Sequence, residues 1–526
     1  MSNIVTNKFK STSAENFLAA IDSPNNMYMF VGKSSEWTGS TVPTAIDSYV
    51  QDGDHWNNMI SLKRISASAN ARYCIPTTLW TSGIIYAAYD DKSNVYANSF
   101  VLADTINYRV YKCIDNDSAT ASTIKPTGTS TSIFQTADGY YWKYMYTIAS
   151  ADVVNFLTTN WMPIQTLISD DSNEHGNQWT VQQASTTSGI EYVKLLNGGS
   201  GYTKLLQNTN LDVPVSGNTI QITLGTGGDN YYSGATIYMH KNDGTQVQSR
   251  MITSYTASTH TATVTSDWSP SINVSEGWQY RILPTVLLNS DGQGAIVEPV
   301  VINGIITDFV IYTKGTGYYS ANSSITGCGG EGAGITVKIS PKTGHGSNAV
   351  DEAFTHHVMI STKLTYNEPG FLQTNDYRKI GLVKNVSVYG STTIAPIDYA
   401  YLTAYHTVST TNESSIFSQD EIFTQTISSV TTGLQAKGIV LEHNIASTTH
   451  YLKYYQDETT GFTPFSTTTG TPTYEIISAS LRTATIGSYT SPTVAAHSGD
   501  IIYIDQRTAI ERNGTSDESY KIILEF

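Results

Sequence analysis

The sequence predicts a mainly β protein of several domains, with antiparallel sheets or barrels, a few short helices and inserted β modules. Three observations support this fold class. Short apolar runs bounded by turn residues recur along the chain, as is typical of strands. A strand-and-turn motif occurs twice near the middle, which indicates modular architecture. The length of 526 residues suggests about three or four domains.

The repeated motif is an apolar run that ends in two glycines and a tyrosine, within residues 190–202 and again within residues 306–318. The aligned positions are Gly199, Gly201 and Tyr202 in the first copy and Gly315, Gly317 and Tyr318 in the second. Two glycines around one small residue allow a sharp turn, so that the tyrosine lies back over the strand pair. A second motif, Gly-x-Gly-Ala, starts at Gly292 and at Gly330, each time ahead of a strand-like run.

The N-terminal part of the chain is predicted to contain two short helices. Thr12 and Glu15 form a capping box ahead of an apolar run, which predicts a helix that Pro24 ends. Residues 26–32 predict a strand. Residues 54–62 carry apolar side chains on one side and predict a second helix.

Strands are then predicted at residues 84–89, 108–114 and 140–148. Residues 108–114 alternate between apolar and polar side chains, which is the pattern of a sheet with one solvated face. Residues 115–132 hold clusters of Asn, Asp, Pro and Gly and are predicted to form a loop.

Residues 185–345 form the repeat region, in which the second unit is compact and the first is interrupted. After Tyr202, the expected continuation of the first unit starts near residues 284–288. The stretch between them predicts a nested β module at about residues 209–283, with a hairpin turn at residues 242–244. Its strands are predicted at residues 219–224, 234–240 and 261–264.

The C-terminal part is also predicted to be β. Residues 406–490, rich in Thr and Ser, predict a second β insertion. The predicted strands lie at residues 358–364, 380–388, 437–441, 451–455, 500–504 and 520–526. A strand pattern at the very end implies a terminus held in a sheet.

The composition indicates a surface of low charge. Charged residues make up 14% of the chain, against roughly 25% in an average soluble protein. The chain is instead rich in Ser, Thr, Asn and Gly, and it contains 35 Tyr. A surface of this composition suits packing against partner proteins, because few charges must be desolvated on assembly. An ordinary Thr-rich β protein would have the same composition. The net charge of −15 and the lack of a basic stripe argue against nucleic acid as a partner.

The cysteines and the N-terminal residues indicate the cellular compartment in which the protein is expected to fold. Cys74, Cys113 and Cys328 are odd in number and scattered, so they imply no disulfide framework or metal knuckle. We expect buried thiols in a protein assembled in a reducing cytoplasm. Residues 1–10 lack the apolar region of a signal peptide, and no stretch approaches the ~20 apolar residues of a membrane span, so membrane insertion is not expected.

Two short motifs resemble catalytic or nucleotide-binding sequences only in part. The Gly-Lys-Ser sequence at residues 32–34 follows a strand, but the glycine that a phosphate-binding loop needs five residues earlier is Met27. Ser200 lacks the second glycine of a nucleophile elbow, because Tyr202 stands there. The second copy of the motif has Thr316 in place of the serine, which favours a turn.

The sequence signals for metal binding and for acid–base catalysis are also weak. His356 and His357 are adjacent and would point to opposite faces of a strand, so they are not expected to share a metal. No ligand spacing surrounds His55, His175, His345 and His497. Turn chemistry explains the Asp and Asn residues at 115–117 and 289–292 better than calcium binding. A carboxylate pair for glycoside hydrolysis need not be close in sequence, and no pair is marked. The sequence predicts no catalytic, cofactor-binding or metal-binding residue and no cofactor.

Segments at both ends of the chain resemble a known family. They read VTNKFK (5–10), FVGKSSEW (30–37), YRVYKCID (108–115), DGYYWKYMY (138–146), SGDIIYIDQR (498–507) and IILEF (522–526). In order, spacing and terminal placement they resemble the baseplate wedge subunit encoded by gene eight of T-even-type contractile-tailed phages. The resemblance covers about residues 1–165, 353–405 and 490–526, and it implies that these residues form one wedge-subunit core. The insertions at residues 185–345 and 406–490 make this chain much longer.

The resemblance implies a structural protein of the virion, located in the tail baseplate and assembled in the host cytoplasm. It implies a mainly β homodimer in each wedge, held between other wedge proteins, with no enzymatic role. Such a subunit acts through stiff sheets and through interfaces that rearrange when the particle attaches to a host. The insertions are expected to project from the wedge and to contact neighbouring fibre or peripheral baseplate proteins.

Two other functions stay open from the sequence. The first alternative is a carbohydrate-binding tail or fibre protein, since exposed Tyr and Trp on β modules can stack on sugars. The second alternative is a tail enzyme that cleaves polysaccharide.

Overall fold

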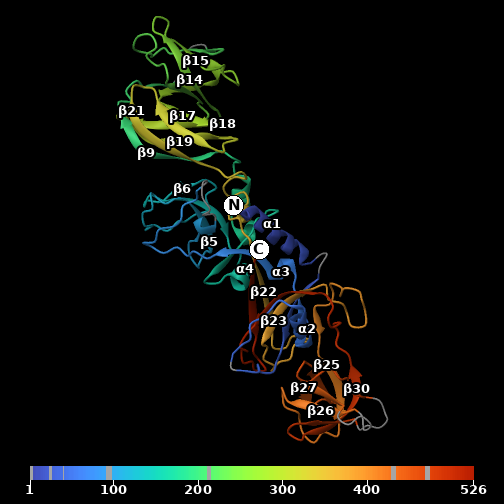
Figure 1. Cartoon of the computed structure of the whole chain (residues 1–526). Coiled ribbons are helices and arrows are strands. Elements are labelled where there is room, and N and C mark those ends of the chain that lie inside the picture. The colour runs from blue at the N-terminus through green and yellow to red at the C-terminus, as the bar shows by residue number, and fades with distance from the viewer. Residues whose placement is uncertain are drawn as a thin grey trace. The chain divides into compact units, whose positions relative to one another are not determined.

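The computed structural model of the chain describes residues 4–22, 26–39, 41–90, 97–209, 215–427, 434–467 and 474–526. Pro24, the expected end of the first helix, lies outside these ranges. The fold is mainly β, with 42% strand and 11% helix, which confirms the predicted class. The chain forms two compact units (Figure 1). Unit 1 comprises Met1–Cys74 and His356–Phe526, and unit 2 comprises Ile75–Thr355.

The larger sheet of unit 1 has five strands in the order β24-β2-β1-β23-β31. Their bounds are β1 Met27–Gly32, β2 Met59–Arg64, β23 Lys379–Lys384, β24 Tyr401–Thr403 and β31 Asp500–Gln506. The central strand β1 is buried along its whole length. Met29 and Val31 pack into one core, while Tyr28 and Phe30 pack into another. Alternate side chains of β1 therefore fill opposite faces of the sheet.

The second sheet of unit 1 holds the C-terminus. Strand β22 His357–Leu364 pairs antiparallel with β32 Glu518–Glu525 and with β3 Ala71–Pro76. Helix α1 Asn7–Ala20 packs beside this sheet, where Phe17 meets the ring of Phe526 at 5.1 Å between centroids. The predicted terminal strand is thus confirmed. The short helices α2 Tyr49–Asn57 and α3 Ala67–Asn70 complete the N-terminal part of this unit.

A closed six-stranded barrel extends from His406 to Thr490, in the order β25-β28-β27-β26-β29-β30. Its strands are β25 His406–Thr411, β26 Ile422–Thr426, β27 Gln435–Asn444, β28 Tyr451–Tyr455, β29 Glu475–Ser478 and β30 Thr483–Thr490. Phe423, Tyr454 and Phe465 fill the interior with ring centroids 4.9–5.4 Å apart. Strand β27 faces two cores, because Val440 packs inside the barrel and Ile439 packs into the main core of unit 1.

Unit 2 starts with a four-stranded sheet in the order β4-β5-β7-β6. The elements of this part are η1 Ala97–Ser99, β4 Phe100–Leu102, β5 Arg109–Asp115, β6 Phe134–Gln135, β7 Tyr141–Thr147, α4 Ser150–Phe156, β8 Trp161–Ile164, α5 Ser172–His175 and α6 Gln178–Gln183. Tyr86, Tyr140 and Trp142 form its aromatic core, with the last two rings stacked at 5.4 Å. No strand element forms between residues 115 and 132, as predicted for a loop.

The two glycine-tyrosine repeats form three two-stranded ribbons, β9·β21, β18·β19 and β17·β20. The bounds are β9 Ile190–Ser200, β17 Thr285–Ser290, β18 Gln293–Ile302, β19 Ile305–Thr316, β20 Ala321–Thr326 and β21 Glu331–Ile339. The first repeat supplies β9, β17 and β18, and the second supplies β19, β20 and β21. Every ribbon pairs a strand of one repeat with a strand of the other, so the two repeats interlock. Tyr202 and Tyr318 are both buried in this arrangement.

A seven-stranded sheet lies in the chain between β9 and β17, in the order β10-β16-β13-β14-β15-β12-β11. Its elements are β10 Leu206–Asn208, β11 Val215–Ser216, β12 Thr219–Gln221, β13 Thr236–Lys241, β14 Val247–Thr256, β15 Thr261–Val264, η2 Val274–Glu276 and β16 Trp278–Leu283. The turn at residues 242–244 joins β13 to β14, and Gly244 adopts a φ of 73° there. The predicted hairpin is confirmed, and the first repeat resumes at Thr285 as expected.

Residues 75–165 belong to the same unit as the repeat region. The family resemblance implies a core that joins them to both termini, and that division into domains stays a prediction.

The two helices predicted near the N-terminus are misplaced. Helix α1 starts at Asn7, and Thr6 rather than Thr12 caps it by accepting a hydrogen bond from the Phe9 amide at 3.3 Å. Thr6 has the extended backbone that a cap requires, whereas Thr12 lies within the helix. Helix α2 ends at Asn57, and the apolar run after it forms β2. Residues 59–64 pair with β1 and β24, and the hydrogen bonds of this pairing favour a strand over the helix that their apolar periodicity predicts.

One strand prediction in unit 2 is wrong, and a second is right about the strand but wrong about its exposure. Residues 84–89 make only one isolated bridge, between Ile84 and Ser122. Strand β5 exists, but the face predicted to be solvated is buried, because other parts of unit 2 cover it. Lys112 on that face is 0% exposed.

Candidate functional site

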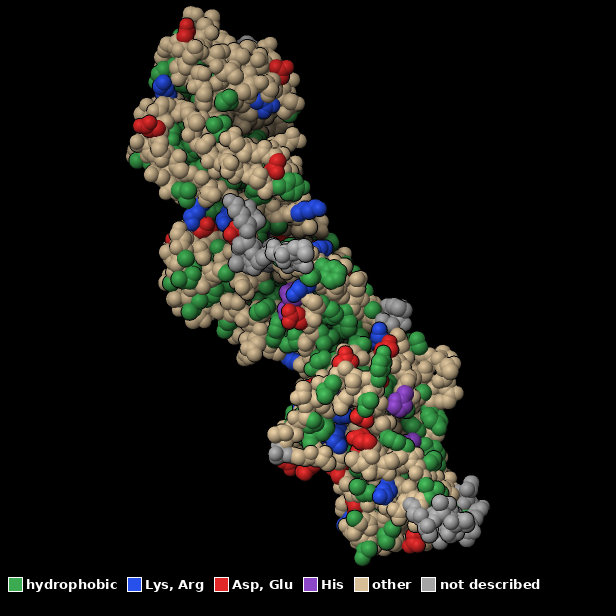
Figure 2. All heavy atoms as spheres, viewed as in Figure 1, with side chains coloured by type: hydrophobic (Ala, Val, Ile, Leu, Met, Phe, Trp, Pro, Cys, Tyr) green, Lys and Arg blue, Asp and Glu red, His purple; other side chains and the backbone are tan. Residues whose placement is uncertain are grey.

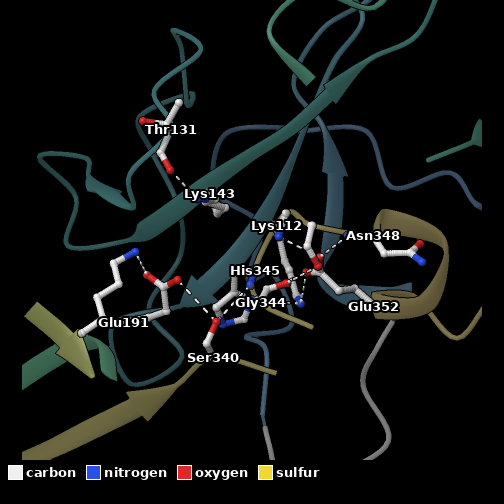
Figure 3. A network of polar contacts seen from close by, with 12 residues as sticks. Lys112, Thr131, Lys143, Glu191, Ser340, Gly344, His345, Asn348 and Glu352 are labelled. Atoms are coloured by element: carbon white, nitrogen blue, oxygen red, sulfur yellow. Dashed lines mark hydrogen bonds and ion pairs between the residues drawn. The ribbon is translucent and has the colours of Figure 1, made fainter. Parts of the chain in front are cut away.

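A buried cluster of ionisable side chains joins the β5 sheet to the chain segment after β21 (Figure 3). Lys112 projects from the middle of β5, and His345 lies in the turns that follow β21. Glu352 is the last residue of helix α7 Ala349–Glu352, which Asn348 caps through its side chain. Lys112 is more than two hundred residues from His345 and Glu352 in the sequence, and the three side chains point toward one another.

The cluster is held by short polar contacts. Lys112 Nζ lies 3.1 Å from Glu352 Oε2 and 3.3 Å from His345 Nδ1. The other carboxylate oxygen of Glu352 accepts a hydrogen bond from the Gly346 amide at 2.7 Å. The Tyr89 ring lies 4.1 Å from the Lys112 ammonium and packs edge-on against the His345 ring.

Burial and charge pairing together set the protonation of the cluster. Burial lowers the pKa of Lys112, and the nearby Glu352 opposes that shift. Burial acts to raise the pKa of Glu352, but Lys112 and the hydrogen bonds outweigh it and hold this pKa below its ordinary value. Burial and the charge of Lys112 lower the pKa of His345 to about 4, so its ring is neutral at pH 7. Lys112 donates to Nδ1, which leaves the ring proton on Nε2.

A second ion pair continues the network toward the ribbons. The Ser340 hydroxyl accepts a hydrogen bond from the His345 amide at 3.0 Å and donates to Glu191 Oε1 at 3.4 Å. Glu191 Oε2 in turn lies 2.6 Å from Lys314 Nζ. Glu191 belongs to β9 and Lys314 to β19, so the network connects the β5 sheet to both repeats (Figure 3).

The side chains of Lys112, His345 and Glu352 have no exposed surface, so a substrate cannot reach them. Lys143 on the neighbouring strand β7 is also buried and donates to the Thr131 carbonyl. Removal of one partner from such a pair leaves an uncompensated buried charge, at a cost of about 3–5 kcal/mol. The arrangement can therefore fix β5 against residues 340–352, but it offers no access for catalysis.

The structure corrects the expectation for His356 and His357. Strand β22 begins at His357, so His356 lies outside the strand and the alternation of faces does not apply to the pair. Their rings lie 4.3 Å apart, and both Nε2 atoms lie close to the carboxylate of Glu525. The three residues form a group whose ligand atoms all lie within 4.8 Å of one another.

His175 also has acidic neighbours that its sequence spacing did not suggest. Asp171, Glu174 and His175 form a second such group on helix α5 and its start. Both ring nitrogens of His175 are engaged within the chain. Nδ1 contacts the Asp171 carboxylate at 3.0 Å, and Nε2 contacts the side-chain amide nitrogen of Gln165. This group is held as a local hydrogen-bonded unit.

The partial motifs of the sequence fall in turns and strand ends. The Lys33 amide donates to the Asn58 carbonyl at 2.8 Å, and the Ser34 hydroxyl donates to Asp420 at 2.6 Å. Those groups are thus occupied and do not form a phosphate cradle. Ser200 ends β9 opposite Glu331 in a ribbon, as expected for a turn rather than a nucleophile elbow.

The Asp residues of the two predicted turns are engaged by other groups of the chain. Asp115 accepts hydrogen bonds from the Asp117 amide at 2.9 Å and from Lys194 Nζ at 2.6 Å. Asp291 accepts hydrogen bonds from the amides of Tyr319 and Ser320. Asp115 therefore closes its own turn, whereas Asp291 holds the backbone of residues 319–320, which are distant in the sequence.

The three cysteines are buried free thiols, as the sequence predicted. Burial raises the pKa of Cys74 and of Cys328 to about 12 and raises that of Cys113 as well. Burial, followed by the charge of Lys379, lowers the pKa of His55 to about 4. These groups are neutral at pH 7.

Unit 2 also contains a polar hollow of about 590 Å³. Its lining includes Asn116, Lys194, Asn289 and Asn322. Tyr319 lies at its edge with 65% of its surface exposed. Amides, an ammonium and an exposed ring are groups that can bind a sugar.

A scan of the chain against protein-family models matches no family, and a search of the curated proteins returns no relative. Each helix in the described parts of the chain is too short or too polar to cross a lipid bilayer.

Proposed function

We propose that the chain is a structural subunit of a phage tail baseplate wedge. It acts as a homodimer that assembles with other wedge proteins and takes part in baseplate rearrangement during host attachment. The observation that carries the proposal is the pairing of the segments on which the family resemblance rests. The Trp37 indole nitrogen donates to the Arg507 carbonyl at 3.0 Å, which joins segments 30–37 and 498–507 from opposite ends of the chain.

The same pairing recurs in unit 2. Segment 108–115 forms β5 and segment 138–146 lies in β7, and the two strands pair side by side. Strand β5 also carries Lys112, which anchors the buried network. The segments that resemble the wedge subunit thus form paired strands and contacts within two sheets, as expected of a structural framework.

The chemistry of the described residues favours a framework over a catalyst. The buried network around Lys112 is closed to solvent. On the face shown in Figure 2, charged side chains are sparse and scattered among uncharged polar groups. Such a surface loses little solvation energy on assembly, which suits a subunit packed between neighbours.

Unit 1 exposes apolar side chains that a partner could cover. Tyr49 and Val50 at the start of α2 are 100% and 77% exposed, and Ile46 just before them is 58% exposed. Beside them lies the edge strand β31, which among the described strands pairs with β23 alone and which exposes Ile502. Exposed apolar side chains next to an unpaired strand edge are typical of protein interfaces.

The decisive experiment is localisation of the chain in the virus particle. Gold-labelled antibodies against the chain should bind the end of the tail in electron micrographs. Labelling of the capsid, of the tail tube or of fibre tips alone would contradict the proposal. Light scattering of the purified chain should show a dimer. Val50→Glu or Ile502→Glu should weaken dimer formation or wedge assembly, whereas the exposed Val154→Glu in unit 2 should not.

A second candidate function is carbohydrate binding, which the polar hollow beside Tyr319 favours. A glycan array should show specific binding that Tyr319→Ala abolishes. Absence of binding on the array would leave the hollow without this role.

A further inference from the structure

The structure brings three metal-ligating side chains together at the C-terminal edge of unit 1. His357 and Glu525 stand directly opposite each other in the β22·β32 pair, so their side chains lie on the same face of the sheet. His356 precedes the strand, and its carbonyl accepts a hydrogen bond from the Phe526 amide at 3.0 Å. The backbone of all three residues is thus fixed by the pairing of the C-terminal strand.

The ligand atoms lie within 4.8 Å of one another, so modest side-chain movements bring them to the spacing of a metal site. His356 Nε2 lies 3.8 Å from Glu525 Oε1, and His357 Nε2 lies 3.9 Å from Glu525 Oε2. Bonds of about 2 Å in a tetrahedral site put neighbouring ligand atoms about 3.3 Å apart. The Glu525 side chain is 65% exposed, so it can rotate toward the two imidazole rings without disturbing the core.

We infer that His356, His357 and Glu525 bind a divalent transition-metal ion, with Zn²⁺ as the best match. Two imidazole nitrogens and one carboxylate are a donor set that zinc sites use, with water in the fourth position. Calcium and magnesium prefer all-oxygen ligands, so this donor set disfavours them. Nothing in the sequence motifs or in the proposed function assigns this site, and the inference does not depend on that function.

Lys10 competes with the metal. Its ammonium on helix α1 lies 4.0 Å from Glu525 Oε1 and is about one-third exposed. A bound cation would displace this flexible side chain, because like charges repel at short range. Replacement of Lys10 should therefore strengthen metal binding, which a site formed elsewhere in the chain would not show.

Isothermal titration of Zn²⁺ into the full chain, expressed without a polyhistidine tag and stripped with chelator, tests the inference. The intact chain should bind one Zn²⁺ with an affinity that falls at least tenfold in His357→Ala and in Glu525→Gln. Lys10→Met should bind several-fold more tightly. His450→Ala, which removes a partly exposed histidine paired with Glu413 in the barrel, is the matched control and should bind like the intact chain.

A spectroscopic readout separates ligation from a fold defect. Co²⁺ in place of Zn²⁺ should give the visible absorption of a tetrahedral centre, and Glu525→Gln should alter it while the circular dichroism spectrum stays unchanged. Absence of stoichiometric binding would overturn the inference. So would binding that His357→Ala and Glu525→Gln leave intact, or binding that His175→Gln abolishes.

Discussion

The Tyr202 ring of the first repeat covers Gly330 of the second so closely that a Cβ on Gly330 would lie 2.3 Å from the ring. The equivalent contact occurs with the two repeats exchanged, since a Cβ on Gly292 would lie 2.3 Å from the Tyr318 ring. The Tyr318 hydroxyl also accepts a hydrogen bond from the Ala295 amide at 3.3 Å. Each tyrosine thus locks its own repeat onto a glycine of the Gly-x-Gly-Ala motif across the ribbon.

Gly330→Ala should therefore destabilise the interlocked ribbons by about 1–3 kcal/mol, because the new methyl group overpacks against Tyr202. Hydrogen–deuterium exchange should show faster exchange in β9 and β21. Gly334→Ala, in the strand β21 that begins directly after Gly330, is the control, since its Cβ would meet Leu196 at an ordinary 3.6 Å. Equal exchange in the two variants would contradict the tyrosine–glycine lock.

Lys112→Met should cost about 3–5 kcal/mol in the stability of unit 2, because it leaves Glu352 buried without its counterion. The double variant Lys112→Met with Glu352→Leu should recover most of that loss. Lys125→Met removes a partly exposed pair with Asp104 and should change stability by at most about 1 kcal/mol. Urea denaturation, followed through exchange of β5 peptides, measures all three. A double variant no more stable than Lys112→Met would argue against the ion-pair explanation.

His345 should make unit 2 less stable as the pH falls from about 6.5 to about 4. The ordinary pKa of 6.5 in the unfolded chain drops to about 4 in the fold, so the unfolded state binds more protons between these values. The full difference corresponds to about 3 kcal/mol. Glu352, whose pKa is lowered in the fold, adds a loss only below its ordinary value of 4.5.

The pH effect is checked by thermal unfolding of the intact chain and of His345→Gln between pH 4 and pH 7. The variant should lose much of the slope in unit 2, while His55 maintains a similar slope in unit 1. A slope in unit 2 that stays unchanged in His345→Gln would exclude this histidine as its source.

Phe423→Ala should destabilise the barrel by about 3–5 kcal/mol, because Phe423 is fully buried against Tyr454 and Phe465. Exchange should increase in β26, β27 and β28. Phe462→Ala is the control in the same part of the chain, since that ring is 54% exposed. The prediction fails if both substitutions affect the barrel equally.

The three thiols should resist modification in the folded chain. Each cysteine is buried, and burial raises the pKa of the Cys74 thiol to about 12, so hardly any thiolate forms at pH 8. Titration with a chromogenic disulfide reagent should release less than one equivalent of dye without denaturant and three equivalents in urea. Rapid reaction without urea would show that a thiol becomes accessible in the native chain.

The local sequence predicts elements whose signals depend on neighbouring residues. The run at residues 26–32 forms β1 because its apolar side chains suit a strand buried on both faces. The turn at residues 242–244 forms a hairpin through the left-handed conformation of Gly244. The buried cysteines and the repeated ribbons are also features that the sequence predicts. The small number and scattered positions of the cysteines indicate buried thiols, and the repeated motif indicates the ribbons.

Tertiary contacts decide the features that local signals predict incorrectly. Lys112 stands in an alternating strand whose polar face appears solvated until residues 340–352 cover it. Glu352 and His345, more than two hundred residues away, supply the charge and acceptor that make its burial possible. No local pattern carries that information, because a counterion depends on which elements pack together.

By itself, the sequence determined the β class, the paired glycine-tyrosine motifs and most strands, since a strand needs only an apolar pattern and turns at its ends. The tertiary structure alone decided which strands pair, that each repeat closes on the other, and that His356, His357 and Glu525 meet. These outcomes depend on contacts between residues far apart in the chain, whose free energy appears only once the sheets have packed.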